Sequence, residues 1–140
     1  MANTTYCRVF PKDTFPVYEF VVVFSRRKGQ WLFSRHRERQ TWETQGGHIE
    51  QGEGPMEAAM RELYEESGAR SYAIRPLFDY WVGRETGSSV GAVFLAEISD
   101  LGELPESEMA EVRAFDTLPE NVTYPAITPV LFERVRELLA

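Results

Sequence analysis

The chain has 140 residues and a formal net charge of -7, with 22 acidic against 15 basic side chains, and 43% of its residues are hydrophobic. This length and apolar content suit one domain with a real core, so we expect a single domain over residues 1–140. The acidic balance argues against passive attachment to nucleic acid or to an anionic membrane surface. A polyanionic ligand would need metal ions to mediate its binding.

The N-terminal sequence MANTTYCRVF lacks a basic region followed by an apolar run, and no stretch approaches the roughly 18 apolar residues of a membrane span. We therefore expect a cytoplasmic protein without membrane contact. Cys7 is the only cysteine, which excludes an intramolecular disulfide and a cysteine-based zinc cluster. We expect a structural role for Cys7.

Strands are predicted first along the chain. Residues 17–24, VYEFVVVF, are nearly continuous in apolar character, which is typical of a strand covered on both faces. A turn at residues 26–29 then leads to residues 30–35, QWLFSR, as the second arm of a hairpin. Three further strands are predicted, at residues 72–82, 91–98 and 111–115. Pro76 is expected to interrupt or bend the first of these.

Two segments are predicted to be helical. The first begins after Gly54, with Pro55 at a position where a missing N–H costs little, and it ends at Gly68, a residue suited to a left-handed cap. The second has Thr128 as its N-cap and Pro129 in its first turn. Its apolar stripe, expected in the core, is Leu131, Val135, Leu138 and Leu139. Together these elements predict a mixed sheet with one helix on either side.

Three glutamates of the first predicted helix, Glu62, Glu65 and Glu66, share one arc at about 100° per residue. The adjacent arc, expected to pack, contains Met56, Ala59, Met60 and Leu63. Carboxylates spaced in this way repel one another by a few tenths of a kcal/mol per pair, which weakens the helix unless cations compensate. Since Mg²⁺ is held by a few carboxylates together with substrate phosphates, the acidic arc is interpreted as a metal platform. The alternative is a solvated acidic face.

The residues around the acidic arc favour the metal site. The pair Gly46-Gly47 lets the backbone approach a ligand closely, and Arg61 places a cation beside the carboxylates. The spacing that joins Gly47 to Glu53, Arg61, the three glutamates and Gly68 resembles the signature box of the Nudix hydrolases, here Gly47 to Ala69. Two positions depart from the usual box: Ala69 replaces a larger aliphatic residue, and Gln45 stands where proline is frequent. Neither is a predicted ligand.

The resemblance implies an α/β/α sandwich with a mixed β-sheet. It also implies hydrolysis of a nucleoside diphosphate linked to another group, with Mg²⁺ or Mn²⁺ as the cofactor. The metal ligands that it implies are Glu62, Glu65, Glu66 and the carbonyl at Gly46. Glu53 and Arg61 correspond to supporting residues, with Arg61 paired to a carboxylate of the box.

Hydrolysis of a phosphoanhydride needs an activated water and neutralised phosphate charge, and metal ions can supply both. We assign Glu62 and Glu66 to the principal ion, and Glu65 to a second ion or to the orientation of the water. The resemblance implies that the general base comes either from the box or from a glutamate on a later loop. The loop candidates are Glu106, Glu108 and Glu111. We favour Glu108 among them.

Substrate contacts are expected on both sides of the box. Arg35, at the end of a predicted strand, is the favoured phosphate ligand. Weaker candidates are Arg26 and Arg84. Tyr80 and Trp81 are candidates for stacking on a nucleobase, although neighbours on a strand face opposite sides, so one of the two is expected in the core. No catalytic role is assigned to His36 or His48, because a lone histidine is frequently incidental.

The leading hypothesis is a pyrophosphohydrolase of nucleoside triphosphates, including oxidised ones such as 8-oxo-dGTP. The alternatives within the enzyme class are hydrolysis of a dinucleoside polyphosphate or of a nucleotide sugar. A non-catalytic nucleotide-sensing module is disfavoured because every acidic position of the box is filled, and an isoprenoid diphosphate isomerase because Cys7 lies outside the box. The expected partner is a small nucleotide, without nucleic acid or membrane, and the chain is expected to be a monomer or a homodimer.

Overall fold

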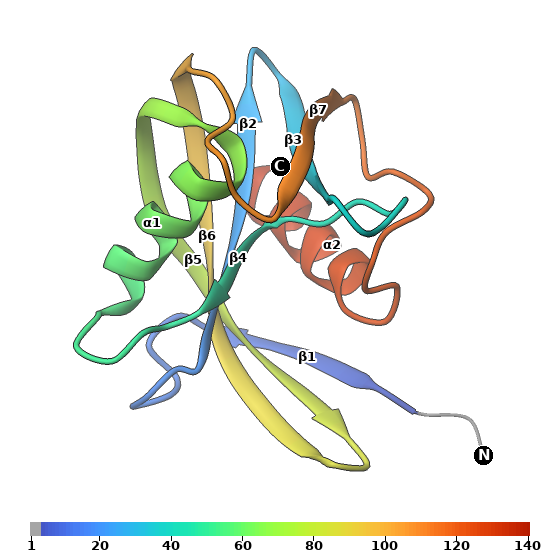
Figure 1. The fold of residues 1–140 in the computed structure, drawn as a ribbon. Coiled ribbons are helices and arrows are strands. Elements are labelled where there is room, and N and C mark those ends of the chain that lie inside the picture. The colour runs from blue at the N-terminus through green and yellow to red at the C-terminus, as the bar shows by residue number, and fades with distance from the viewer. Residues whose placement is uncertain (1–3) are drawn as a thin grey trace.

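A computed structural model describes residues 4–140 of the chain. Residues 1–3, which begin the N-terminal segment discussed above, lie outside the described part. The described chain forms one mixed sheet of seven strands with two helices (Figure 1). The elements in chain order are β1 Tyr6–Pro11, β2 Phe20–Arg27, β3 Gln30–His36, β4 Gln45–His48, α1 Pro55–Ser67, β5 Ala69–Arg84, β6 Gly87–Leu101, β7 Met109–Phe115 and α2 Thr128–Leu139. Neither helix of residues 4–140 has the length and apolar character of a membrane span.

The sheet divides along β2. The strand order is β1-β5-β6-β2-β3-β7, and only the pair β2 and β6 is parallel. On the other edge of β2, residues 20–23 pair with β4 and residues 25–27 pair with β3. The strands β3 and β4 therefore separate at this point, and β4 carries its two glycines out towards α1.

One helix covers each face of the sheet, as the apolar run in β2 predicted (Figure 1). Val21 and Val23 pack in the same cluster as Leu63 of α1. Phe24, on the opposite face, lies with its ring 5.9 Å from that of Phe132 in α2. The expected architecture, a mixed sheet between two helical layers, is confirmed.

The ends of α1 are confirmed, whereas two details of helix burial are corrected. Gly68 ends α1 in the left-handed conformation, with φ 82°, and its N–H donates to the carbonyl of Tyr64. Met60, expected in the core, is 43% exposed, because the buried arc of α1 is centred between Ala59 and Glu66, and Met60 lies about 100° from that centre. Leu138 is also exposed, at 42%, in the last turn of α2.

The start of α2 differs from the prediction by one residue. Ile127 occupies the N-cap, and Thr128 is the first helical residue. The helix therefore has no side-chain capping hydrogen bond, and Thr128 is buried. The sequence ITP fits either start, because Pro129 is tolerated at the first or the second helical position.

Two strands were not anticipated. β1 pairs antiparallel with β5, and β4 contains the glycine pair that was expected only as a close-approach turn. β5 and β6 are also longer than predicted, and with β1 they extend beyond the two helices (Figure 1). The predicted irregularity at Pro76 is confirmed by a register shift between Pro76 and Phe78.

Candidate active site

The glycine pair of β4 lies against two glutamates of α1. Gly46 has φ 150°, and a Cβ atom there would lie 2.3 Å from the carbonyl oxygen of Val21, so no other residue fits this position without displacing the backbone. The N–H of Gly46 donates to Oε1 of Glu66 at 2.8 Å. A Cβ on Gly47 would lie 2.8 Å from Oε2 of Glu62. Absence of side chains at both positions thus brings two carboxylates up to the backbone of β4.

Burial makes both carboxylates unfavourable as anions. Desolvation raises the pKa of Glu66 to about 9, assisted by the neighbouring charges of Glu62 and Glu43 and opposed by the hydrogen bond from Gly46. Desolvation also raises the pKa of Glu62, which the Arg61 guanidinium opposes. Two adjacent, partly buried carboxyl groups with raised pKa values are an arrangement that a bound cation would stabilise.

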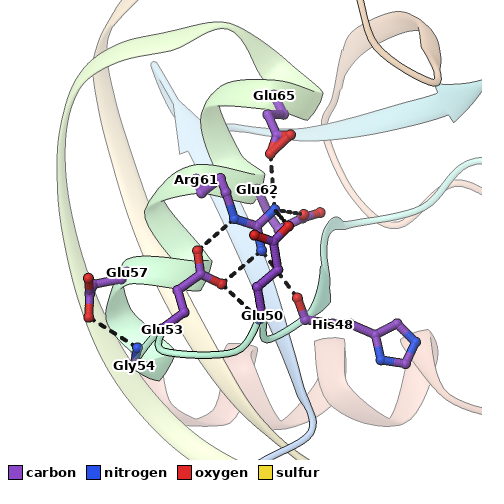
Figure 2. A network of polar contacts seen from close by, with 8 residues as sticks. All are labelled: His48, Glu50, Glu53, Gly54, Glu57, Arg61, Glu62 and Glu65. Atoms are coloured by element: carbon purple, nitrogen blue, oxygen red, sulfur yellow. Dashed lines mark hydrogen bonds and ion pairs between the residues drawn. The ribbon is translucent and has the colours of Figure 1, made fainter.

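Arg61 is the centre of a polar network around these groups (Figure 2). Its Nε and Nη2 donate to both oxygens of Glu53 at 2.7 and 2.9 Å, and its Nη1 donates to Glu65 at 3.0 Å and to Glu62. Nη2 also donates to the carbonyl of His48 at 3.2 Å. These bonds raise the pKa of Arg61, and in return Arg61 lowers the pKa of Glu53 to about 2. Arg61 therefore fixes the loop before α1 and the orientation of Glu62 together.

The donor set fits a hard divalent ion. Glu62, Glu66 and the backbone of Gly46 offer only oxygen donors from adjacent elements, which is the chemistry that Mg²⁺ and Mn²⁺ prefer. Glu65 is more open, with 45% of its side chain exposed, and binds Arg61. Within residues 4–140, no three His, Cys, Asp or Glu side chains already form a metal-binding cluster. An ion between Glu62 and Glu65 would have to replace Arg61 as their partner.

A cavity of about 290 Å³ opens on the other side of β4, and Gly46 and Gly47 form part of its wall. Its apolar lining includes Phe20, Val22, Tyr80, Val82, Ile127 and Leu131. The ring of Phe20 lies 4.3 Å from that of His48, which also lines the cavity. Arg84 and Ser89 contribute polar groups to the same lining. The glycine pair therefore separates the glutamates of α1 from an open, mainly apolar cavity.

The two stacking candidates face opposite sides of β5. Tyr80 lines the cavity and is otherwise buried, and burial raises the pKa of its hydroxyl. Trp81 lies instead over Gly83, where a Cβ atom would be 2.1 Å from the indole ring. Strand alternation thus brings Tyr80, and not Trp81, to the cavity.

The other predicted contacts lie along β3 and β7. Arg35 Nε donates to Glu111 at 3.3 Å, and its Nη1 donates to the carbonyl of Arg39. Glu108 has 82% of its side chain exposed and lies 3.6 Å from Nε2 of His36. Neither Arg35 nor Glu108 lines the cavity.

Sequence reasoning missed Glu43, which lines the cavity and whose negative charge contributes to the raised pKa of Glu66. It also missed Tyr124 and Thr128, which reach the cavity from the C-terminal part of the chain. A single glutamate outside the box carries no spacing signal. Glu43 is held by a contact with Thr123, which lies 80 residues further along the chain.

Three comparisons place the chain among known proteins. The family model described as the NUDIX domain matches residues 16–131. YtkD of Bacillus subtilis, provisionally named an 8-oxo-dGTP diphosphatase, is 34% identical over 106 residues, which are 74% of this chain and 65% of YtkD. An RNA pyrophosphohydrolase of Rhizobium meliloti is 46% identical over 43 residues, 31% of this chain and 26% of that protein. The chain thus matches less than two thirds of either relative.

Among solved structures, the Bacillus subtilis pyrophosphohydrolase BsRppH superposes with a TM-score of 0.81 at 27% identity. The superposition covers 97% of this chain and 92% of BsRppH. The NUDIX domain of Shewanella oneidensis NrtR, solved with ADP-ribose, superposes with a TM-score of 0.67 at 18% identity, and the superposition covers 94% of each chain. The second likeness concerns the fold alone.

Proposed function

Because the chain belongs to the Nudix family, we propose that it hydrolyses a phosphoanhydride bond in a nucleoside diphosphate derivative. The favoured substrate is a nucleoside triphosphate, oxidised or not, and the products are a monophosphate and pyrophosphate. The observation that carries the proposal is the contact of two partly buried glutamates, Glu62 and Glu66, with a glycine pair that also forms part of the wall of a cavity.

In this proposal Glu62, Glu66 and the carbonyl of Gly46 hold Mg²⁺ or Mn²⁺. The bound ion neutralises phosphate charge and lowers the pKa of a water molecule. Arg61 holds Glu62 and Glu65 in place, and Glu65 orients the water or accepts its proton. Glu108 is the alternative base.

The phosphate and base ends of the substrate are assigned by position. Tyr80 forms part of the cavity wall and is proposed to contact the base, whereas Trp81 faces away from this cavity. Arg35 is proposed as a phosphate ligand, although it would first have to leave Glu111. Arg84, in the cavity lining, is the second candidate.

A second candidate substrate is the triphosphate at the 5′ end of an RNA. The short but 46% identical match to a protein named an RNA pyrophosphohydrolase favours it. The net charge of -7 argues against extended contacts with an RNA backbone, so only the terminal nucleotides would be bound. A cytoplasmic location and a monomeric or homodimeric state complete the proposal and derive from the sequence.

The test is a substrate panel with the purified protein in Mg²⁺ or in EDTA, with products identified by chromatography. The panel contains nucleoside triphosphates, 8-oxo-dGTP, dinucleoside polyphosphates, nucleotide sugars and a 5′-triphosphate oligoribonucleotide. Metal-dependent release of pyrophosphate from one compound, abolished in Glu66→Gln, supports the proposal and identifies the substrate class. Tight binding without turnover of any compound would instead favour the sensing module.

A further inference from the structure

Glu43 is a buried carboxylate in the cavity wall that lies outside the box. The residue is only 9% exposed, and it lines the cavity with Gly46 and Gly47. Its Oε2 accepts hydrogen bonds from Oγ1 of Thr123 at 2.9 Å and from Nη1 of Arg39 at 3.2 Å. Within residues 4–140 both donors contact Oε2 and none contacts Oε1, so Oε1 is free to accept a hydrogen bond from a ligand.

The position of this carboxylate is fixed by the backbone on both sides. Glu43 and Ser34 exchange two backbone hydrogen bonds of 2.8 and 2.9 Å. The N–H of Thr123 donates to the carbonyl of Trp42 at 2.8 Å, and the hydroxyls of Thr41 and Thr123 lie 2.8 Å apart. Glu43 is therefore held in advance of binding, which reduces the entropy that a ligand contact would cost.

The surroundings of Glu43 suit a flat, mainly apolar group that carries a hydrogen-bond donor. The Phe20 and His48 rings, Tyr80 and aliphatic side chains form the walls of the cavity. An ionised carboxylate only accepts hydrogen bonds. A ligand amino group would satisfy it, whereas a ligand carbonyl would place two acceptors against each other beside a largely buried carboxylate.

We propose that Glu43 is a specificity-determining residue that accepts a hydrogen bond from an amino group on the substrate base. The protein then prefers a base with an amino group to the corresponding base with a carbonyl or a hydrogen at that position. This inference rests on the nucleotide function proposed for the same site.

The experiment compares kcat/KM within matched pairs of triphosphates: GTP with ITP, ATP with ITP, and CTP with UTP. The wild-type protein is expected to favour the amino member of at least one pair by about tenfold to a hundredfold, the usual effect of a hydrogen bond to a buried charged group. Glu43→Gln should bring that ratio to within about threefold of one. The corresponding monophosphates, titrated by calorimetry in EDTA, should show the same ratios without a contribution from metal.

Two variants separate recognition from folding and from overall charge. Glu97→Gln removes a carboxylate that pairs with Arg26 on the surface, and it should leave every ratio unchanged. Thr123→Val keeps the Glu43 charge and removes one of its two donors, so the ratio should fall only in part. Thr123→Val also keeps the test valid if Glu43→Gln does not fold.

The outcomes distinguish this inference from the function on which it rests. Equal kcat/KM values within all pairs for the wild type, or a ratio that Glu43→Gln leaves intact, would overturn the role of Glu43 while the hydrolase proposal stands. A uniform loss of activity with unchanged ratios, or only a higher Mg²⁺ requirement, would likewise assign Glu43 to structure or to metal binding. Absence of both turnover and binding for every nucleotide would contradict the proposed function itself.

Discussion

Gly47 lies directly against Glu62: a Cβ atom on residue 47 would be 2.8 Å from Oε2 of that carboxylate. The nearest atoms belong to the end of a flexible side chain, and the backbone of Gly47 does not have a positive φ. Gly47→Ala should therefore fold, with a loss of less than about 1 kcal/mol, while displacing the Glu62 carboxylate. We expect kcat/KM to fall at least about tenfold, because a proposed metal ligand moves relative to its partners.

The matched control is Gly54→Ala. Gly54 is the N-cap of α1, and a Cβ atom there would contact only the Glu57 carboxylate, at 3.3 Å. This variant should retain activity within about threefold, since no proposed ligand moves. Equal activities for the two variants, measured on the same triphosphate, would argue against Glu62 as a ligand.

Glu66→Gln should separate catalysis from stability. Burial raises the folded-state pKa of Glu66 to about 9, above its ordinary value of 4.5. The stability associated with the neutral carboxyl is therefore fully present below pH 4.5 and is lost as the pH rises towards 9. In EDTA at pH 8 the free energy of unfolding of the variant should exceed that of the wild type by about 1–3 kcal/mol. The two free energies of unfolding should converge near pH 4.5.

The same variant should lose the stabilisation that divalent ions give. Millimolar Mg²⁺ or Mn²⁺ should raise the Tm of the wild type, because the ions bind the folded state and neutralise buried charge. The rise should be smaller in Glu66→Gln, and turnover should fall at least about a hundredfold. Glu133→Gln, on the exposed face of α2, is the control and should behave as the wild type. A wild-type Tm that does not respond to either ion would contradict a preformed site.

Local sequence signals predicted α1 and the family correctly, because capping glycines and the spacing of the box act within a few residues. The apolar run of β2 likewise indicated a strand covered on both faces. β4 was missed because two adjacent glycines have little strand preference, and they form a strand only through pairing with residues 21–22 of β2. Long-range pairing therefore decided what local preference could not.

The parts of the site that escaped prediction also depend on distant segments. Glu43 is held by Thr123, and Arg35 is turned towards Glu111 because β3 pairs with β7 in a register that places the two residues opposite each other. No short motif contains these relationships. Strand alternation did predict that only one of Tyr80 and Trp81 faces the core, but not which one.

Arg61→Met should make the free energy of unfolding vary less with pH in the acidic range. Arg61 lowers the folded-state pKa of Glu53 to about 2, so this contribution to stability is present above pH 4.5 and is lost as the pH falls towards 2. The variant lacks the contribution at every pH. The difference in unfolding free energy between wild type and variant should therefore be largest near pH 6 and shrink steadily below pH 4.5, as measured by urea titrations between pH 2 and 7.

Arg70→Met provides the comparison for a surface ion pair. Arg70 lies 3.0 Å from Asp100, and both side chains are at least half exposed. Its effect should stay within about 1 kcal/mol across the same pH range. If the Arg61→Met curve ran parallel to that of the wild type, the bond from Arg61 to Glu53 would not be a source of acid sensitivity.

The orientation of β5 predicts effects of different size on KM for two neighbouring substitutions. Tyr80→Leu removes an aromatic wall of the cavity while retaining apolar volume, so KM for the preferred nucleotide should rise about fivefold or more with a smaller change in kcat. Trp81→Leu alters the surface over Gly83, away from this cavity, and should change KM less than twofold. Steady-state kinetics on both variants, with thermal unfolding as a check on folding, measures the contrast. A larger KM effect in Trp81→Leu would place the base outside the cavity, on the side of β5 that faces Gly83.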